Sequence, residues 1–303
     1  MSHVTVIVSY NRARFLPMAL RSIARQTHAD HDVVVIDLGT DDTGSISSSF
    51  DRVALVRAPT VSAGRNEAIR QTRAEYVALL SSDTIAAPDR LRRQVEELDR
   101  APRAALCYTD VSFCDEEGRA AAPPTHATPG DRPSGDLYRR LVLGGNPILG
   151  ATVMLRRTAL AEVGLFDEDP GISQDYDLWV RMARRHPFLH LPFALTTYRA
   201  ATFAIPEDGS VAATRRHLVA FEKSEQHARA DGLEPRALRR RRGQILADLG
   251  YQLLLAGSHR EARHVLAEAF AHRPDPRTAR WMAASLLPAE AVRLLRAARA
   301  CFR

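Results

Sequence analysis

The chain is predicted to be an α/β protein with a mostly parallel sheet flanked by helices, followed by an all-helical C-terminal module. Two observations predict this class. Short apolar runs alternate with segments of helical periodicity through the first hundred residues. From about Glu207 the strand signals stop, and the remaining sequence is rich in Ala, Leu and Arg. We therefore expect a sheet domain over residues 1–205 and a helical module over residues 206–303.

Five apolar runs in the first part of the chain are expected to be strands. Such runs are typical of parallel strands that are buried on both faces. They are Val4–Val8, Val33–Ile36, Val53–Val56, Tyr76–Leu80 and Ala104–Tyr108. Apolar residues at helical spacing predict helices between them over residues 15–23, 63–72 and 88–99, the last with Pro88 in its first turn.

A long loop is expected over residues 111–135, because prolines and glycines cluster there. A loop of this length beside a site is commonly functional. The chain then resumes with two strands and two helices. The strands are expected at Thr152–Leu155 and Leu195–Tyr198, and the helices at Arg157–Val163, which ends at Gly164, and over residues 175–185.

The helical module contains a weak internal echo. The pattern Glu261-Ala262, Leu266, Ala269 recurs as Glu290-Ala291, Leu295, Ala298. It resembles tetratricopeptide-type helical hairpins, and a chance match in a sequence of this composition is the alternative. The last segment, Ala289–Phe302, mixes leucines with arginines. It is expected either to close the module or to form a basic amphipathic helix for peripheral membrane contact or dimerisation.

The composition argues against a disordered chain and against a nucleic-acid-binding protein. The 303 residues are 45% hydrophobic and 26% charged, so a packed core is expected. Of the 42 basic residues only Lys223 is a lysine, which we attribute to a GC-rich, bacterial genome rather than to nucleic-acid binding. The net charge of +6 still suits polyanionic ligands such as diphosphates, or an anionic membrane surface.

The sequence also bears on the compartment. The three cysteines have no paired spacing and are expected to be reduced thiols. The N-terminus does not read as a signal peptide, and no apolar run approaches the length that spans a bilayer. We expect a cytoplasmic protein, either free or peripheral to the inner face of the membrane.

Polar residues follow successive predicted strands, where open α/β sheets bind their ligands. In chain order these are Ser9, Tyr10, Asn11 and Arg12 after the first strand, Asp37 after the second, and Ser81, Ser82 and Asp83 after the fourth. Arg65 and Asn66 lie near a helix start, where N–H groups and a guanidinium suit phosphate. Each signal is weak alone, and Asp37 could instead cap a helix. Together they predict a nucleotide site, where Asp83 could hold a divalent cation.

The same segments resemble family 2 glycosyltransferases, which are inverting enzymes of the GT-A fold that use nucleotide-diphosphate sugars. The resemblance covers about residues 3–200. It rests on VTVIVSYNRARFL, VVVIDLGTDDT, SAGRNEAIRQTRAEYVALLSSD and PDRLRRQ in the first half, and on ATVMLRR, LAEVGLFDE and SQDYDLWVRM in the second. It implies a nucleotide-binding half over about residues 1–110 and an acceptor half over about residues 136–205.

The resemblance also implies roles for matched residues. Asp37 falls where the family contacts the base, and Arg65 faces the nucleotide. Asp83 falls on the last carboxylate of the Asp-x-Asp element, which binds Mn²⁺ or Mg²⁺. Asp175 falls on the Asp of a Glu-Asp pair that supplies the general base. Gly150 and Gln174 are then expected on the acceptor side.

Four positions depart from the family pattern. Ser81 replaces the first Asp of Asp-x-Asp, Leu38 a second Asp, Gln174 the Glu before the base, and Ala201 a His near the metal. Two hypotheses follow. The first is an inverting transferase that moves a sugar from its nucleotide-diphosphate donor to an acceptor hydroxyl, with a divalent metal and an Asp base. The second is a nucleotide-binding relative with weak or no activity that acts through its helical tail.

Under either hypothesis, the sequence identifies the binding partners only in part. The acceptor could be a glycan, a lipid-linked molecule or a small molecule, and nucleic acid is not expected. A kinase or dehydrogenase is disfavoured because no P-loop or GxGxxG occurs. A nucleotidylyltransferase is disfavoured because Ser9–Arg12 is not a Gly-rich basic loop.

Overall fold

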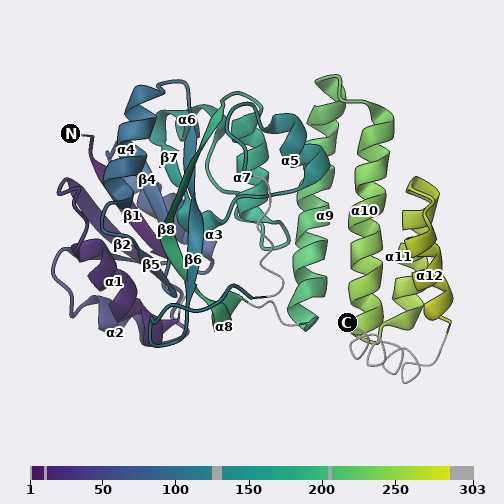
Figure 1. The fold of residues 1–303 in the computed structure, drawn as a ribbon, viewed down its shortest axis with the longest axis horizontal. Helices are drawn as coiled ribbons and strands as arrows, with labels where there is room; N and C mark the ends of the chain where they lie inside the picture. The colour runs from purple at the N-terminus through teal and green to yellow at the C-terminus, as the bar shows by residue number, and fades with distance from the viewer. Residues whose placement is uncertain (1, 10–11, 125–131, 204–206, 287–303) are drawn as a thin grey trace. The chain divides into compact units, whose positions relative to one another are not determined.

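The structure is a computed structural model, and it describes residues 2–9, 12–124, 132–203 and 207–286. The chain divides into two compact units. The first, here the sheet unit, comprises Met1–Leu141, Asn146–Pro170 and Leu178–Ala204, and the second, the helical unit, comprises Val142–Gly145, Gly171–Asp177 and Ile205–Arg303. Two short segments that precede residue 178 therefore group with the C-terminal helices. Figure 1 shows the course of the chain with its helices and strands labelled.

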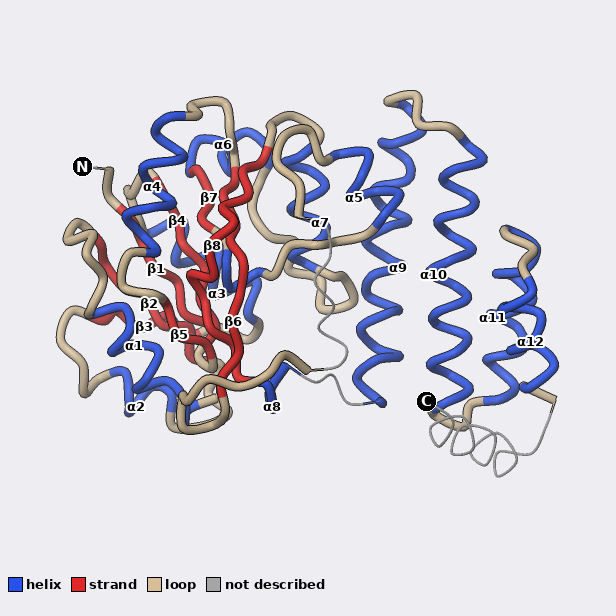
Figure 2. The backbone as a smooth tube through the Cα atoms, in the orientation of Figure 1, coloured by secondary structure: helices blue, strands red, loops and turns tan. Residues whose placement is uncertain are grey.

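The sheet unit is built on one eight-stranded sheet, in the spatial order β3-β2-β1-β4-β7-β6-β8-β5 (Figure 2). Its strands are β1 (Val4–Ser9), β2 (His31–Asp37), β3 (Val53–Arg57), β4 (Tyr76–Ser81), β5 (Thr84–Ala86), β6 (Leu106–Cys114), β7 (Met154–Arg156) and β8 (Phe188–Arg199). Strands β1 to β4 pair in parallel, and β7 is antiparallel to both β4 and β6. The predicted fold class, a largely parallel α/β sheet with helices after it, is confirmed.

Helices connect the strands of the sheet unit and follow it. The α-helices are α1 (Leu16–Ala24), α2 (Thr43–Ser47), α3 (Val61–Gln71), α4 (Arg90–Arg100), α5 (Tyr138–Gly144), α6 (Arg157–Val163), α7 (Gln174–Ala183) and α8 (Ala200–Phe203). Two 3-10 turns, η1 (Ala13–Phe15) and η2 (Gly150–Thr152), complete it. One face of the sheet packs against α1 and α4. Their buried residues recur at helical spacing: Leu16, Leu20, Ile23, Leu91, Val95 and Leu98.

The first four strands agree with the predicted runs to within two residues at each end. Strands β1, β2 and β4 are largely buried, whereas only Val56 of β3 is buried. Two later strands are longer than predicted. Strand β6 continues past Tyr108 through polar residues, and the Ser112 hydroxyl lies 2.8 Å from that of Thr197 on β8. Strand β8 begins at Phe188, with its register against β6 shifting near Pro192. A proline at such an irregularity costs no ladder hydrogen bond.

The helical unit contains α9 (Glu207–Ala230), α10 (Pro235–Leu255), α11 (His259–His272) and α12 (Pro276–Ala284). Helix α10 packs against both α9 and α11, around a core that includes Leu249, Leu253 and Leu266. Gly250 permits this contact, since a Cβ there would lie 2.5 Å from Leu266 Cγ. The predicted second repeat and the basic segment Ala289–Phe302 lie outside the described residues. Among the described helices, none has the length and apolar character to cross a membrane.

Candidate donor and base residues

The carboxyl ends of β1 and β4 lie level with one another. Ser9 pairs with Ser81 in the register, and the Ser82 N–H donates to the Ser9 carbonyl at 2.9 Å. Beyond them the chain turns sharply into β5. The Thr84 hydroxyl donates to the Ser81 carbonyl at 2.8 Å and accepts from the Ser81 N–H at 3.2 Å. This turn fixes Asp83 at the edge of the sheet.

Two arginines face Asp83. Arg12 Nη1 lies 3.4 Å from Asp83 Oδ2, and the carboxylate side chain is 11% exposed. Arg199 Nη1 donates to the Asp83 carbonyl at 2.8 Å, and Arg199 itself is fully buried. Burial lowers the pKa of Arg199, with nearby charges partly offsetting it. The turn therefore offers one reachable carboxylate within a positive environment.

Asp37 ends β2 beside a cavity of about 640 Å³. Its carboxylate accepts from the Gly39 N–H at 2.8 Å and from Arg57 Nε at 3.3 Å. Gly44 gives it room, because a Cβ at that position would lie 2.7 Å from Asp37 Oδ2. The cavity is lined by Asp37, Leu38, Gly39, Asp41, Asp42, Gly44, Ser45, Arg57, Ala58 and Pro59. It has hydrogen-bonding groups and a volume in the range of small-molecule binding sites.

Arg65 and Asn66, on α3, connect the sheet to a distant segment of the same unit. Arg65 Nη2 donates to Ser9 Oγ at 3.1 Å, and its guanidinium lies 5.0 Å from the centre of the Phe166 ring. The Asn66 amide donates to the Phe166 carbonyl at 2.9 Å and accepts from its N–H at 3.0 Å. Both residues are almost fully buried. These contacts give them a structural role, and contact with a nucleotide stays a prediction.

The residues predicted to lie on the acceptor side fall in different units. Gly150 opens η2 in the sheet unit, and its carbonyl accepts from the Val153 N–H at 3.1 Å. Gln174 and Asp175 begin α7, and both group with the helical unit. The partial positive charge at the N-terminal end of a helix favours a carboxylate such as Asp175. The role of Asp175 as a base stays a prediction.

The structure brings Ser9, Arg12, Arg65 and the Ser81–Asp83 turn together at one edge of the sheet. Asp37 ends the neighbouring strand β2, whereas Tyr10 and Asn11 lie outside the described residues. Sequence reasoning missed Arg57 and Arg199. Arg57 carried a signal, since it ends β3 as Asp37 ends β2, and the two pair in register.

The described residues contain no group of three or more His, Cys, Asp or Glu side chains that could hold a metal ion. A site of fewer protein ligands is still chemically reasonable, because Mg²⁺ and Mn²⁺ can complete their coordination with phosphate oxygens and water. Asp83 fits this case, since its carboxylate is reachable and already faces the cation of Arg12. Ser81 could contribute only a hydroxyl, so one carboxylate would carry the ion.

Comparison with known proteins gives a family match. The family described as glycosyl transferase family 2 matches residues 5–164. An uncharacterized glycosyltransferase of Rickettsia conorii is 27% identical over 60% of this chain and 31% of its own length. The uncharacterized glycosyltransferase YwdF of Bacillus subtilis is 22% identical over 73% of this chain and 82% of its own length. The chain spans 31% of each of the first two curated relatives and 58% of the third.

Solved structures share the fold. The S. aureus protein TarS in complex with UDP superposes with a TM-score of 0.60 at 17% identity, over 90% of this chain and 81% of that one. The mannosyltransferase PcManGT of Pyrobaculum calidifontis, in complex with GDP-Man and Mn²⁺, gives 0.55 at 21% identity, over 97% and 87%. At these identities the likeness establishes the fold alone.

Proposed function

The chain belongs to glycosyl transferase family 2, and we propose that it transfers a sugar from a nucleotide-diphosphate donor to an acceptor hydroxyl, with inversion at the anomeric carbon. The observation that carries the proposal is the gathering of Ser9, Arg12 and the Ser81–Asp83 turn at the carboxyl edge of the sheet. Open α/β sheets bind ligands at this edge. The UDP and GDP-Man complexes of the structural neighbours support the donor class.

The nucleobase and the diphosphate of the donor would occupy different parts of this edge of the sheet. Asp37 would accept hydrogen bonds from the base in the cavity that Arg57 also lines. Arg12 is 44% exposed and would turn from Asp83 to the diphosphate, whose charge and fixed oxygens suit a guanidinium. Arg65 would hold the Ser9 hydroxyl in place, because its guanidinium donates a hydrogen bond to that hydroxyl. These residues bind and orient the donor before any bond changes.

A divalent cation would be held by Asp83, with the Ser81 hydroxyl or water beside it. When bound, such an ion neutralises the negative charge that develops on a leaving diphosphate. Asp83 would contribute the single protein carboxylate, so the affinity for the ion alone should be modest. PcManGT with its Mn²⁺ supports the choice of a divalent metal.

Asp175 is proposed as the general base. The acceptor oxygen attacks the anomeric carbon from the side opposite the diphosphate, and the bond from that carbon to the diphosphate oxygen breaks. Inversion follows from this in-line geometry. The Asp175 carboxylate accepts the proton that the acceptor hydroxyl loses, a contribution of about 10²–10⁴ in rate. Neither a nucleophilic side chain nor a covalent intermediate is needed.

The test follows the release of nucleoside diphosphate from UDP-glucose, UDP-GlcNAc and GDP-mannose with Mn²⁺, with water as the acceptor. Asp175→Asn should reduce turnover by about 10²-fold or more without changing donor affinity. Asp169→Asn, on the exposed loop before α7, is the matched control. An equal fall in turnover and affinity would instead give Asp175 a binding or structural role.

A second function is favoured by one specific observation. Ser81 and Gln174 stand where the family carries carboxylates, which weakens the metal and base positions together. The chain would then bind a nucleotide without turning it over and act through its helical unit. Mn²⁺-dependent binding of UDP or GDP, with no turnover of any of the three donors, would support this alternative.

A further inference from the structure

The segment Gly171–Asp177, which contains the proposed base, groups with the helical unit. Its contacts with α9 include a main-chain hydrogen bond, a ring contact and an ion pair. The Ser173 N–H donates to the Arg216 carbonyl at 3.0 Å, and the Tyr176 ring lies 4.4 Å from the His217 ring. Lys223 Nζ lies 3.1 Å from Asp177 Oδ1. The Asp177 N–H also donates to the Ser173 carbonyl, so these contacts bracket the first turn of α7.

The ion pair of Asp177 involves a buried carboxylate. The Asp177 side chain is 4% exposed, and a buried carboxylate is costly without a positive partner. Lys223 supplies one, and it is the single lysine in a chain that otherwise uses arginine for its 42 basic residues. Its side chain is 43% exposed, so its ammonium group is accessible to solvent. Asp177 is two residues from Asp175, on the same turn of the same helix.

His217 holds the other side of the turn. Arg241 Nη2, on α10, lies 3.1 Å from His217 Nε2. A guanidinium can only donate, so Nε2 accepts and the imidazole carries its proton on Nδ1. Burial, together with the charge of Arg241, lowers the pKa of His217 to about 4, so the ring is neutral near neutral pH. Tyr176, itself almost fully buried, therefore packs on a neutral ring whose orientation Arg241 fixes.

We propose that α9 positions the catalytic base, with Lys223 and His217 as its positioning residues. The inference rests on the proposed function, because it assumes that Asp175 is the base. A displacement of about 1 Å at a reacting group can cost on the order of 10²-fold in rate. Loss of the Lys223 charge should therefore reduce turnover while the donor residues of the sheet unit still bind nucleotide.

The single lysine permits a test on the folded wild-type protein. Acetylation removes the charge of Lys223, whereas reductive dimethylation retains it. Hydrolysis of UDP-glucose, UDP-GlcNAc and GDP-mannose is measured after each treatment, together with the affinity for the nucleoside diphosphate and Mn²⁺. Acetylation should reduce kcat by about 10-fold or more at unchanged affinity, and dimethylation should leave kcat unchanged. Full kcat after acetylation that mass spectrometry shows to be complete would overturn the proposal.

Two variants control for the reagents and for folding. Lys223→Arg keeps the charge and cannot be acetylated at this position, so acetylation should leave its kcat unchanged. A loss of kcat in this acetylated variant would overturn the proposal, since the cause would then lie elsewhere, such as at the N-terminal amine. Arg215→Met removes a different ion pair of α9, with Glu261, and should leave kcat at the wild-type value.

His217→Gln gives an independent measurement. It removes the ring that packs on Tyr176 and should lower kcat at unchanged nucleotide affinity. A normal kcat in this variant would overturn the role of His217. Asp175→Asn separates the two proposals. If it retains turnover, the assignment of the base has failed. If it loses turnover but acetylation has no effect, the base stands and the inference about α9 alone has failed.

Discussion

Two cavities of similar volume open at opposite edges of the same sheet. The cavity at the carboxyl edge, about 640 Å³, lies beside Asp37, and the one at the amino edge, about 590 Å³, lies beside Tyr76, Asp99 and Arg156. At the carboxyl edge, Asp37 and Asp83 face arginines that are 80% and 44% exposed. Because these arginine side chains are exposed, the phosphates of a ligand can reach them from solvent.

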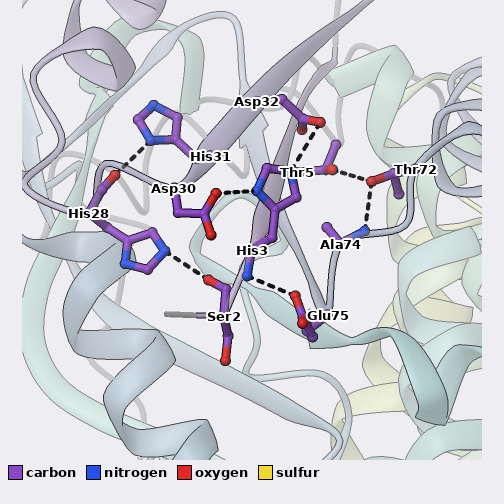
Figure 3. A network of polar contacts seen from close by, with 10 residues as sticks. All are labelled: Ser2, His3, Thr5, His28, Asp30, His31, Asp32, Thr72, Ala74 and Glu75. Atoms are coloured by element: carbon purple, nitrogen blue, oxygen red, sulfur yellow. Dashed lines mark hydrogen bonds and ion pairs between the residues drawn. The ribbon is translucent and has the colours of Figure 1, made fainter.

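The amino edge satisfies its polar groups internally. The Tyr76 hydroxyl donates to Asp99 Oδ1 at 2.6 Å, and Arg156 donates to the carbonyls of Leu98 and Ala104. Nearby, His3 lies between Asp30 and Asp32, as Figure 3 shows. Loss of the Arg156 side chain would leave part-buried main-chain carbonyls without these donors. The difference teaches that volume does not identify the site: we assign stability to the amino edge and binding to the carboxyl edge.

Replacing one carboxylate at each edge should give the largest contrast. Changes around metal ligands typically cost 10–100-fold in affinity, so Asp83→Asn should weaken Mn²⁺-dependent binding of UDP or GDP by about 100-fold or more. Asp99→Asn should leave that binding unchanged and lower stability instead. Isothermal titration and urea unfolding measure the two effects. Equal nucleotide affinity in wild type and Asp83→Asn would show that Asp83 does not contribute to the binding site.

Replacing one arginine at each edge should give an intermediate contrast. Arg156→Met leaves three main-chain carbonyls and the Tyr76 hydroxyl without a charged donor, so the free energy of unfolding should fall by about 2–4 kcal/mol. Arg57→Met leaves Asp37 with its hydrogen bond from the Gly39 N–H, so the free energy of unfolding should fall by only about 1 kcal/mol, while nucleotide binding weakens through the loss of support for Asp37. Urea unfolding at one protein concentration compares them. A larger loss of stability in Arg57→Met would reverse the assignment of the two edges.

The smallest effect is a pH dependence at the amino edge. Burial acts to lower the pKa of His3, but hydrogen bonds to Asp30 and Asp32 and their charges outweigh it, so the pKa rises above 6.5. Both ring nitrogens face carboxylates, which favours the protonated form. The added stability is therefore complete below the unfolded pKa and is lost as pH rises through the folded one. The gap in melting temperature between wild type and His3→Gln should shrink over that range. A gap that widens with pH would contradict the ion pair.

The sequence predicted the parts of this fold that depend on local patterns. Runs such as Tyr76–Leu80 are buried on both faces and read as strands without ambiguity. The second half was harder, because β6 continues through Thr109 and Asp110, and β8 passes a proline. Strand β5, only three residues long, was too short to detect.

The candidate site was likewise predictable from the sequence only in part. Its strand-end residues follow from topology, since parallel strands bring their carboxyl ends to one edge. Their partners do not follow from it. The pairing of Asp83 with Arg12 depends on side-chain placement at a turn. The pairing of Asp177 with Lys223 joins segments far apart in the sequence, and only the rarity of lysine marked that residue beforehand.

The location of a bound nucleotide tests the central claim most directly. A crystal structure with Mn²⁺ and UDP or GDP, whichever raises the melting temperature more, would provide it. The nucleobase should lie in the cavity beside Asp37, the diphosphate should lie near Arg12, and Mn²⁺ should be bound by the Asp83 carboxylate. A nucleotide in the amino-edge cavity beside Tyr76 and Arg156, or Mn²⁺ bound away from Asp83, would contradict the account.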